Sequence, residues 1–260
     1  MQNFGTILKD WRGRRRLSQL ALGLEADVSA RHIAFLETGR SAPSRKMVLH
    51  LSDVLGIPRP ERNTLLTAAG FAPAYPKRGL DDMDLAPLKA AIEHTITRHA
   101  PFPAIVIDRH WCLIDANAPA RMLLTPFGIK DGDSLLKAIF EAPSRTSYFE
   151  NWAEFGYYTA KRLRTESAHL GGVPELDRVV EGIESDAEVA SYEPPKELPA
   201  IIPARYRAGE MVLSMFTTIA QFGSAEEISL ADLRIELMFP ADEHTRQIFE
   251  AMSAKGGAPS

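Results

Sequence analysis

The chain has 260 residues, of which 45% are hydrophobic and 25% charged, a composition typical of a globular protein with room for two domains. No apolar run reaches the about 18 residues of a membrane span, and the arginine-rich N-terminus lacks the apolar segment of a secretory signal. The first 79 residues hold 13 Lys and Arg against 6 Asp and Glu, a net charge of +7, whereas the remainder holds 17 against 28, a net charge of −11. A basic N-terminal module on an acidic body favours nucleic acid as the partner of the N-terminal module alone.

The N-terminal residues predict three helices. Apolar residues at helical spacing predict the first of them at Phe4, Ile7, Leu8 and Trp11. Residues 18–37 predict two further short helices, with Ser18 and Ser29 as their N-caps. Asp27 in the turn between them tolerates a left-handed backbone, and Gly23 allows a close approach of the two helices. These features are typical of a helix-turn-helix.

The second helix of such a motif presents its N-terminal end to the DNA major groove. The residues that we expect to read bases are Gln19, Ser29, Ala30, Arg31 and His32. The basic run at residues 12–16 is either a solvated face or a phosphate-binding site. The expected phosphate contacts are Arg14, Arg15, Arg40, Ser44 and Arg45.

Ser44 also caps a predicted fourth helix that ends at Gly56, and a fifth helix is expected from Pro60 to Ala69. This part of the chain resembles the Xre/Cro/C1-type bacterial repressors over about residues 4–55. The resemblance is carried by Leu17-Ser18-Gln19, Val28-Ser29 with Ile33, Glu37-Thr38-Gly39-Arg40 and Pro43-Ser44. It implies an all-α, five-helix, lambda-repressor-like DNA-binding domain. Ala21 and Asp27 depart from the family pattern, and an ordinary αα-hairpin is the alternative.

Proline and glycine in residues 72–79 predict a domain boundary. We expect a helix-turn-helix domain at 1–71, a linker at 72–84, a second domain at 85–253 and a disordered tail at 254–260. Asp84 is the expected N-cap of a helix whose apolar face is formed by Leu85, Leu88, Ile92 and Ile96.

The second domain begins with a predicted β-hairpin at 104–108 and 111–115. The single cysteine, Cys112, excludes an internal disulfide and is expected to be an inert buried thiol in the second of these strands. Helices are predicted at 117–124, 134–140, 144–166 and 174–184, and strands at 201–207, 211–218 and 233–239. Alternation in the last strand predicts one buried face, formed by Leu233, Ile235, Leu237 and Phe239, and a closing helix follows Pro240. The expected fold class is α+β.

The second domain resembles a PAS-like sensor and, over about residues 100–250, the ligand-binding domain of MmyB-like transcription regulators. The resemblance is carried by Trp111 and Asn117, Leu135 with Ile139-Phe140, Asn151-Trp152, Arg162-Leu163-Arg164, Ser214 through Gly223 and Leu233 through Arg246. It implies a pocket for a small, mostly apolar ligand, with a fatty-acid-like molecule as the leading candidate.

Ligand pockets are lined by apolar side chains with a few polar groups that orient the ligand. The expected wall residues are Phe102, Trp111, Phe127, Phe140, Trp152, Phe155, Phe216 and Phe222, and the expected orienting groups are Asn117 and Arg164. For each aromatic residue the alternative is that it packs in the hydrophobic core and does not contact a ligand.

The sequence contains no nucleophile, phosphate-loop or dinucleotide motif, and we expect neither catalysis nor a cofactor. Asp242-Glu243-His244 is a conceivable metal site, but adjacent helical residues point apart. The sequence therefore predicts a cytoplasmic bacterial transcription regulator, associated with the nucleoid, whose homodimer binds operator DNA under the control of a small ligand. The alternative is an adaptor whose helix-turn-helix binds a sigma factor or another protein.

Overall fold

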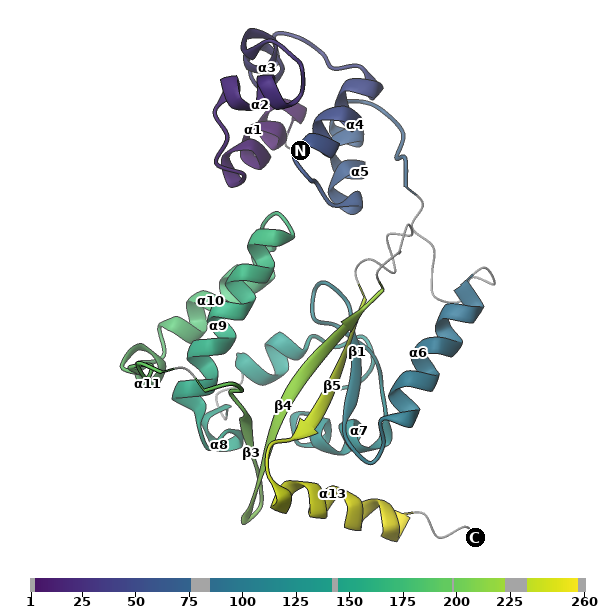
Figure 1. Ribbon diagram of the computed structural model, residues 1–260, viewed down its shortest axis with the longest axis vertical. Coiled ribbons are helices and arrows are strands. Elements are labelled where there is room, and N and C mark those ends of the chain that lie inside the picture. Colours follow the sequence, from purple (N-terminus) through teal and green to yellow (C-terminus); the bar gives the residue numbers. More distant parts are fainter. Residues whose placement is uncertain (1–2, 76–84, 142–144, 198, 223–232, 257–260) are drawn as a thin grey trace. The chain divides into compact units, whose positions relative to one another are not determined.

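The computed structural model describes residues 3–75, 85–141, 145–197, 199–222 and 233–256 (Figure 1). The chain forms two compact units, one N-terminal and one C-terminal. We call the N-terminal unit the head, and each unit is described by itself. No helix among the described residues is both long enough and apolar enough to cross a membrane.

The head consists of α1 (Phe4–Arg14), α2 (Gln19–Glu25), α3 (Ala30–Glu37), α4 (Arg45–Val54) and α5 (Arg59–Ala68). The five-helix prediction is confirmed. Its core is one apolar cluster that draws on all of these helices and includes Phe4, Leu8, Trp11, Leu22, Ile33, Leu36, Val48, Leu51, Leu65 and Leu66. Burial of these side chains is the main stabilising contribution to the head.

The turn between α2 and α3 has the geometry that its sequence predicts. The Ser18 hydroxyl accepts a hydrogen bond from the Ala21 amide at 3.0 Å, and the Ser29 hydroxyl accepts one from the His32 amide at 3.1 Å. Asp27 adopts a left-handed backbone with φ of 51°. Both predicted N-caps are thus confirmed, and the turn orients α3 across α2.

The expected linker begins later than predicted. The Asn63 side-chain oxygen accepts hydrogen bonds from the amides of Ala74 and Tyr75, and its amide nitrogen donates to the Tyr75 carbonyl at 2.7 Å. Phe71 and Ala74 pack on the head core. Residues 72–75 are therefore fixed to the head, and the rest of the expected linker, with the Asp84 cap, lies outside the described residues.

The C-terminal unit is built on an antiparallel sheet, which confirms the α+β class; the likeness to a PAS-like sensor stays a prediction. Its strands are β1 (Ala104–Ile107), β2 (Leu113–Ala116), β3 (Ala204–Ala208), β4 (Met211–Gln221) and β5 (Arg234–Pro240). They lie in the order β2-β1-β5-β4-β3, so that β5 is the central strand, between β1 and β4 (Figure 1).

Both faces of this sheet are covered. Register pairs Val106 with Ile235 and Ile105 with Glu236, and successive side chains on a strand point to opposite faces. Val106 and Ile235 pack with Ile92 and Ile96 of α6 (Ala86–Arg98). The predicted buried face of the last strand is confirmed at Leu233 and Ile235, and the opposite face is covered as well, since Arg234 and Glu236 are also buried.

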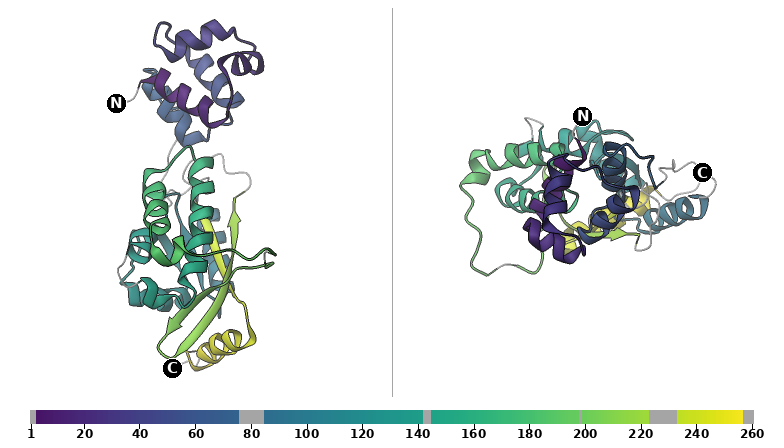
Figure 2. Two further views of the ribbon diagram at one scale, coloured as in Figure 1. Left: turned by 90° about the vertical axis from the view of Figure 1, so that its left-hand side faces the viewer. Right: turned by 90° about the horizontal axis from the view of Figure 1, so that it is seen from above.

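The helices after the hairpin are α7 (Ala118–Leu124), a 3-10 turn (Thr125–Phe127), a π-helix (Leu136–Phe140), α8 (Arg145–Tyr148), α9 (Trp152–His169), α10 (Pro174–Glu184) and α11 (Ala187–Ala190). The closing helix, α13 (Glu243–Gly256), lies beside β4 (Figure 2). Its Phe249 packs with Leu213 and Met215 of that strand. It continues past residue 254, where a disordered tail was expected. Residues 257–260 lie outside the described part of the chain.

The single helix expected at 144–166 is broken between α8 and α9. The Glu150 amide donates to the Arg205 carbonyl at 2.8 Å, and the Asn151 side-chain oxygen accepts from the Arg205 amide at 3.0 Å. Phe149 forms a β-bridge with Tyr206. The helix stops because these residues pair with the outer edge of β3, which would otherwise expose unpaired backbone groups.

Cys112 was expected in a buried strand, but it lies just before β2 and is half-buried. Burial, together with the charge of Asp108, raises the pKa of its thiol above the ordinary value. The thiol is therefore protonated at neutral pH, and a protonated thiol is a poor nucleophile.

We expect Gly23→Ala to destabilise the head. A Cβ at this position would lie 2.6 Å from the Val28 carbonyl oxygen, and overpacking of this kind costs typically about 1–3 kcal/mol. Amide hydrogen exchange of peptides from residues 18–37 in the full chain should report this loss. The control is Gly13→Ala, because no neighbouring atom lies within 4 Å of the added Cβ; equal exchange in the two variants would contradict the tight contact.

Candidate functional site

The N-terminal end of α3 carries four of the predicted base-reading residues. Arg31 is exposed, and its guanidinium carbon lies 5.2 Å from the centre of the Phe35 ring, a contact that holds the side chain along the helix. Ser29 is exposed, and its hydroxyl caps α3 by accepting from the His32 amide, whereas Ala30 and His32 are half-buried. Arg31 is therefore the long side chain that this end of the helix presents to solvent.

Gln19 is held by a buried ion pair. Arg12 donates to both carboxylate oxygens of Glu37, at 2.6 and 3.0 Å, and the Gln19 amide nitrogen donates to the same carboxylate at 2.8 Å. Burial opposes ionisation of Glu37, but the hydrogen bonds from Arg12 and Gln19 outweigh it, so the pKa of Glu37 lies below its ordinary value. These hydrogen bonds join the start of α2, at Gln19, and the end of α3, at Glu37, to Arg12 of α1.

The predicted phosphate contacts differ in their surroundings. Arg14, Arg40 and Arg45 are exposed, and Ser44 caps α4 by accepting from the Met47 amide at 3.2 Å. Arg15 donates to the carbonyls of Leu55 and Gly56, at 2.8 and 3.0 Å. A DNA phosphate bound by Arg15 would compete for the guanidinium N–H donors with these two carbonyls, which lie at the C-terminal end of α4.

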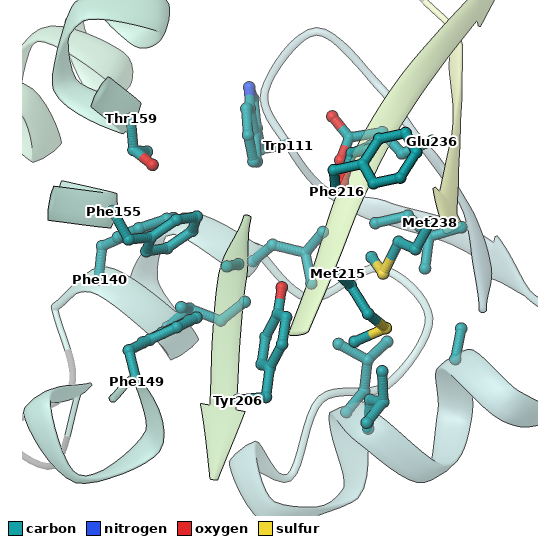
Figure 3. Close-up of a pocket in the computed structure, with 18 of the residues that line it drawn as sticks. Trp111, Phe140, Phe149, Phe155, Thr159, Tyr206, Met215, Phe216, Glu236 and Met238 are labelled. Carbon is teal, nitrogen blue, oxygen red and sulfur yellow. The ribbon is translucent and has the colours of Figure 1, made fainter. Parts of the chain in front are cut away.

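The C-terminal unit contains a cavity of about 220 Å³ between the sheet and the helices α7 and α9 (Figure 3). Most of its wall is apolar and aromatic. Figure 3 shows the rings of Phe140, Phe149 and Phe155 together on one side, and Trp111 and Glu236 at another end. The cavity therefore offers a long apolar surface with one polar end, a combination suited to an amphiphilic small molecule.

Five of the ten predicted ligand-binding residues line this cavity. They are Trp111, Phe127, Phe140, Phe155 and Phe216. Three of the other aromatic residues are core: Phe102 packs with the cluster of β4 and α13, Phe222 with the cluster of α6, and Trp152 is buried with its ring 6.3 Å from that of Phe140. These three residues are therefore core residues and do not line the cavity.

Neither predicted orienting group lines the cavity. The Asn117 side chain accepts from the amides of Ala104 and Ala120 and donates to the carbonyls of Ile96 and Phe102. All four of its hydrogen-bonding positions are used to join α6, β1 and α7, so its role is structural. Arg164 is exposed on α9 and pairs with Glu184 of α10. It lies one residue past Leu163, on a helix face that does not meet the cavity.

The polar end of the cavity is formed by charged residues that the sequence analysis did not assign to the ligand site. Arg162 of α9 pairs with the buried carboxylate of Glu236 on β5, and both line the cavity. Beside them Arg234 pairs with Glu166, whose Oε1 also accepts from the Trp111 indole at 3.0 Å. We call these five residues the charge cluster. Spacing could have indicated it, since Arg162 and Glu166 stand four apart on a helix and Arg234 and Glu236 two apart on a strand.

Trp111 joins this cluster through its ring as well. The guanidinium carbons of Arg162 and Arg234 lie 5.0 and 5.5 Å from its ring centre, within the range of cation–π attraction. Its backbone is left-handed, with φ of 58°, which is unusual for a bulky residue and is typical of functional positions. Burial and the charge of Glu236 raise the pKa of nearby Tyr206 well above its usual range, so this phenol stays neutral.

Among the described residues no group of three or more His, Cys, Asp or Glu side chains is placed to hold a metal ion. At the conceivable site in residues 242–244, Asp242 caps α13 by accepting from the Thr245 amide at 2.7 Å, and Glu243 pairs with Arg246. Both carboxylates thus have structural partners.

The Arg12–Glu37 pair predicts an acid-sensitive head. Since the pKa of Glu37 is lowered by folding, the ion pair stabilises the head above the ordinary pKa and this contribution is lost as pH falls through the folded-state pKa. Calorimetry of the full chain between pH 7 and 3 should follow the loss, with the head transition identified by its response to Gly23→Ala.

The variant Glu37→Gln should lower the stability of the head by about 3 kcal/mol at pH 7, because it leaves the largely buried Arg12 without its ion-pair partner. The variant should also reduce the pH dependence of this stability. Glu25→Gln removes an exposed carboxylate from the same unit and serves as the control. An unchanged acid response in Glu37→Gln would show that other groups cause it.

Two family models match the chain. A helix-turn-helix domain matches residues 3–65, and the MmyB-like transcription regulator ligand binding domain matches residues 88–252. No curated protein matches at a significant level. The first match covers the head and the second covers the sheet, the cavity and the charge cluster. The chain therefore belongs to the family of DNA-binding transcription regulators in which a helix-turn-helix precedes an MmyB-like ligand-binding domain.

Proposed function

We propose that this regulator binds operator DNA as a homodimer, and that a small, mostly apolar, fatty-acid-like effector in the C-terminal cavity modulates this binding. The observation that carries the proposal is the aromatic cavity with one polar end, which lies in the domain that the family match identifies as ligand-binding. Its volume of about 220 Å³ is below the range of about 300–1,000 Å³ typical of drug-sized ligands. A medium-length acyl chain suits this size.

The DNA-binding part of the proposal rests on the head. Exposed Arg31 at the start of α3 is the best candidate for a base contact, because arginine makes bidentate hydrogen bonds to guanine in the major groove. Exposed Arg14, Arg40 and Arg45 are candidates for phosphate contacts. The net charge of +7 on residues 1–79 supports this assignment.

The homodimer is proposed on grounds of symmetry. Paired helix-turn-helix heads match two half-sites about one helical turn of DNA apart, roughly 34 Å. An effector changes DNA affinity only if it binds two conformations of the protein unequally. We propose that ligand occupancy alters the separation of the two heads.

Arg31→Ala should weaken binding to an operator selected from genomic fragments by about 1–3 kcal/mol, because a base-reading arginine contributes that much discrimination. Binding to a scrambled duplex should change little. Arg14→Ala should weaken both equally, as expected of a phosphate contact. Fluorescence anisotropy titrations measure all four affinities, with exposed Arg178→Ala as the control; an unchanged operator affinity in Arg31→Ala would exclude it from base reading.

Thr159→Phe should abolish effector binding, because Thr159 on α9 lines the cavity and a phenyl ring there would occupy much of its volume. Calorimetric titration of the ligand-stripped protein with 1-octanol should show at least a tenfold loss of affinity. Thr165→Phe places the same ring on the exposed side of the same helix and should bind as the wild type does. Equal binding by both variants would place the ligand elsewhere.

The alternative function, an adaptor that binds another protein, is favoured by one feature of the head. Leu20 and Leu24 on α2 are 62% and 75% exposed, and an exposed apolar patch is a surface on which another protein can bind. Salt separates the two functions. Raising the salt concentration from 50 to 200 mM should weaken DNA binding by orders of magnitude, whereas a contact through these leucines should be insensitive to it.

A further inference from the structure

The cavity is electrically balanced. Of the described residues that line it, the arginine and the glutamate are Arg162 and Glu236, and they form an ion pair with each other. The second ion pair behind them, Arg234 with Glu166, is also neutral as a unit. A ligand that enters therefore meets one positive and one negative group in contact, with no net charge to attract a charged head.

An anionic ligand that pairs with Arg162 would leave the carboxylate of Glu236 without its partner, at a cost in free energy. The side chain of Glu236 is only 6% exposed, and a buried carboxylate that loses its partner is strongly disfavoured. A ligand carboxylate at this end would also lie beside the carboxylate of Glu236, and like charges repel in a poorly solvated site.

A neutral head has no such conflict. Arginine has five N–H donors and a carboxylate has about four acceptor sites, so an intact ion pair retains capacity to donate and to accept. A hydroxyl or an unsubstituted amide offers at least one donor and one acceptor and can bind both partners at once. The neutral phenol of Tyr206, which lines the same cavity, adds a further polar group without charge.

We propose that the Arg162–Glu236 pair selects an uncharged amphiphile, with a hydroxyl or amide head, over the corresponding free fatty acid. Glu236 is the specificity-determining residue, because its charge excludes a carboxylate from Arg162. This inference rests on the proposed function, since it names the head-group class of the effector in that same cavity.

The test uses three probes with the same eight-carbon chain and different heads: 1-octanol, octanamide and octanoate. Calorimetric titrations of the ligand-stripped full chain at pH 7 should show octanol and octanamide binding at least tenfold more tightly than octanoate. In Glu236→Gln the octanoate affinity should rise at least tenfold relative to the octanol affinity. Glu184→Gln, which breaks the exposed pair with Arg164 outside the cavity, is the charge-matched control and should keep the wild-type ranking.

The outcomes separate the inference from the proposed function. Octanoate binding as tightly as octanol to the wild type, or a ranking unchanged by Glu236→Gln, would overturn the selection by charge but leave an apolar effector site. Binding of none of the three probes would overturn the proposed function and the inference together. If Glu236→Gln does not fold, as judged by circular dichroism, the wild-type ranking alone decides the inference.

Discussion

The charge cluster around Trp111 is the constraint on which the C-terminal unit depends. Arg162 and Glu166 stand one helical turn apart on α9, and Glu236 and Arg234 stand two apart on β5, so each arginine meets the carboxylate of the other element. Two ion pairs with opposite order of charge allow one register between helix and strand. Loss of Arg162 would leave the buried carboxylate of Glu236 unpaired, which would destabilise the packing of α9 on the sheet.

This constraint also determines the chemistry of the cavity. The apolar walls come from aromatic residues that the α8–α9 break and the π-helix bring together, such as Phe149 and Phe140. The polar end comes from the cluster itself. Because the same two residues, Arg162 and Glu236, hold α9 and face the ligand, a ligand that binds them changes the interactions that position α9. The cavity is thus suited to a sensor, in which ligand binding and helix position are linked.

The sequence predicted those features that depend on local chemistry. The caps at Ser18 and Ser29, the left-handed Asp27 and the strands of the sheet follow from neighbouring residues, and the structure confirms them. The sequence did not predict the features that depend on residues far away along the chain. Glu236 reads as an exposed residue of an alternating strand until α9 supplies Arg162, and residues 149–151 read as helix until β3 offers its edge. Asn117 reads as a ligand group, but its partners are backbone atoms of three elements.

We propose that occupancy of the cavity controls DNA binding. The most direct test is the operator affinity of one preparation in three states: as purified, stripped of bound small molecules on a hydrophobic resin, and with the stripped material added back. We expect stripping to change the affinity at least fivefold, the lower end of typical allosteric coupling, and adding the material back to restore it. Three equal affinities would contradict control of DNA binding by the cavity.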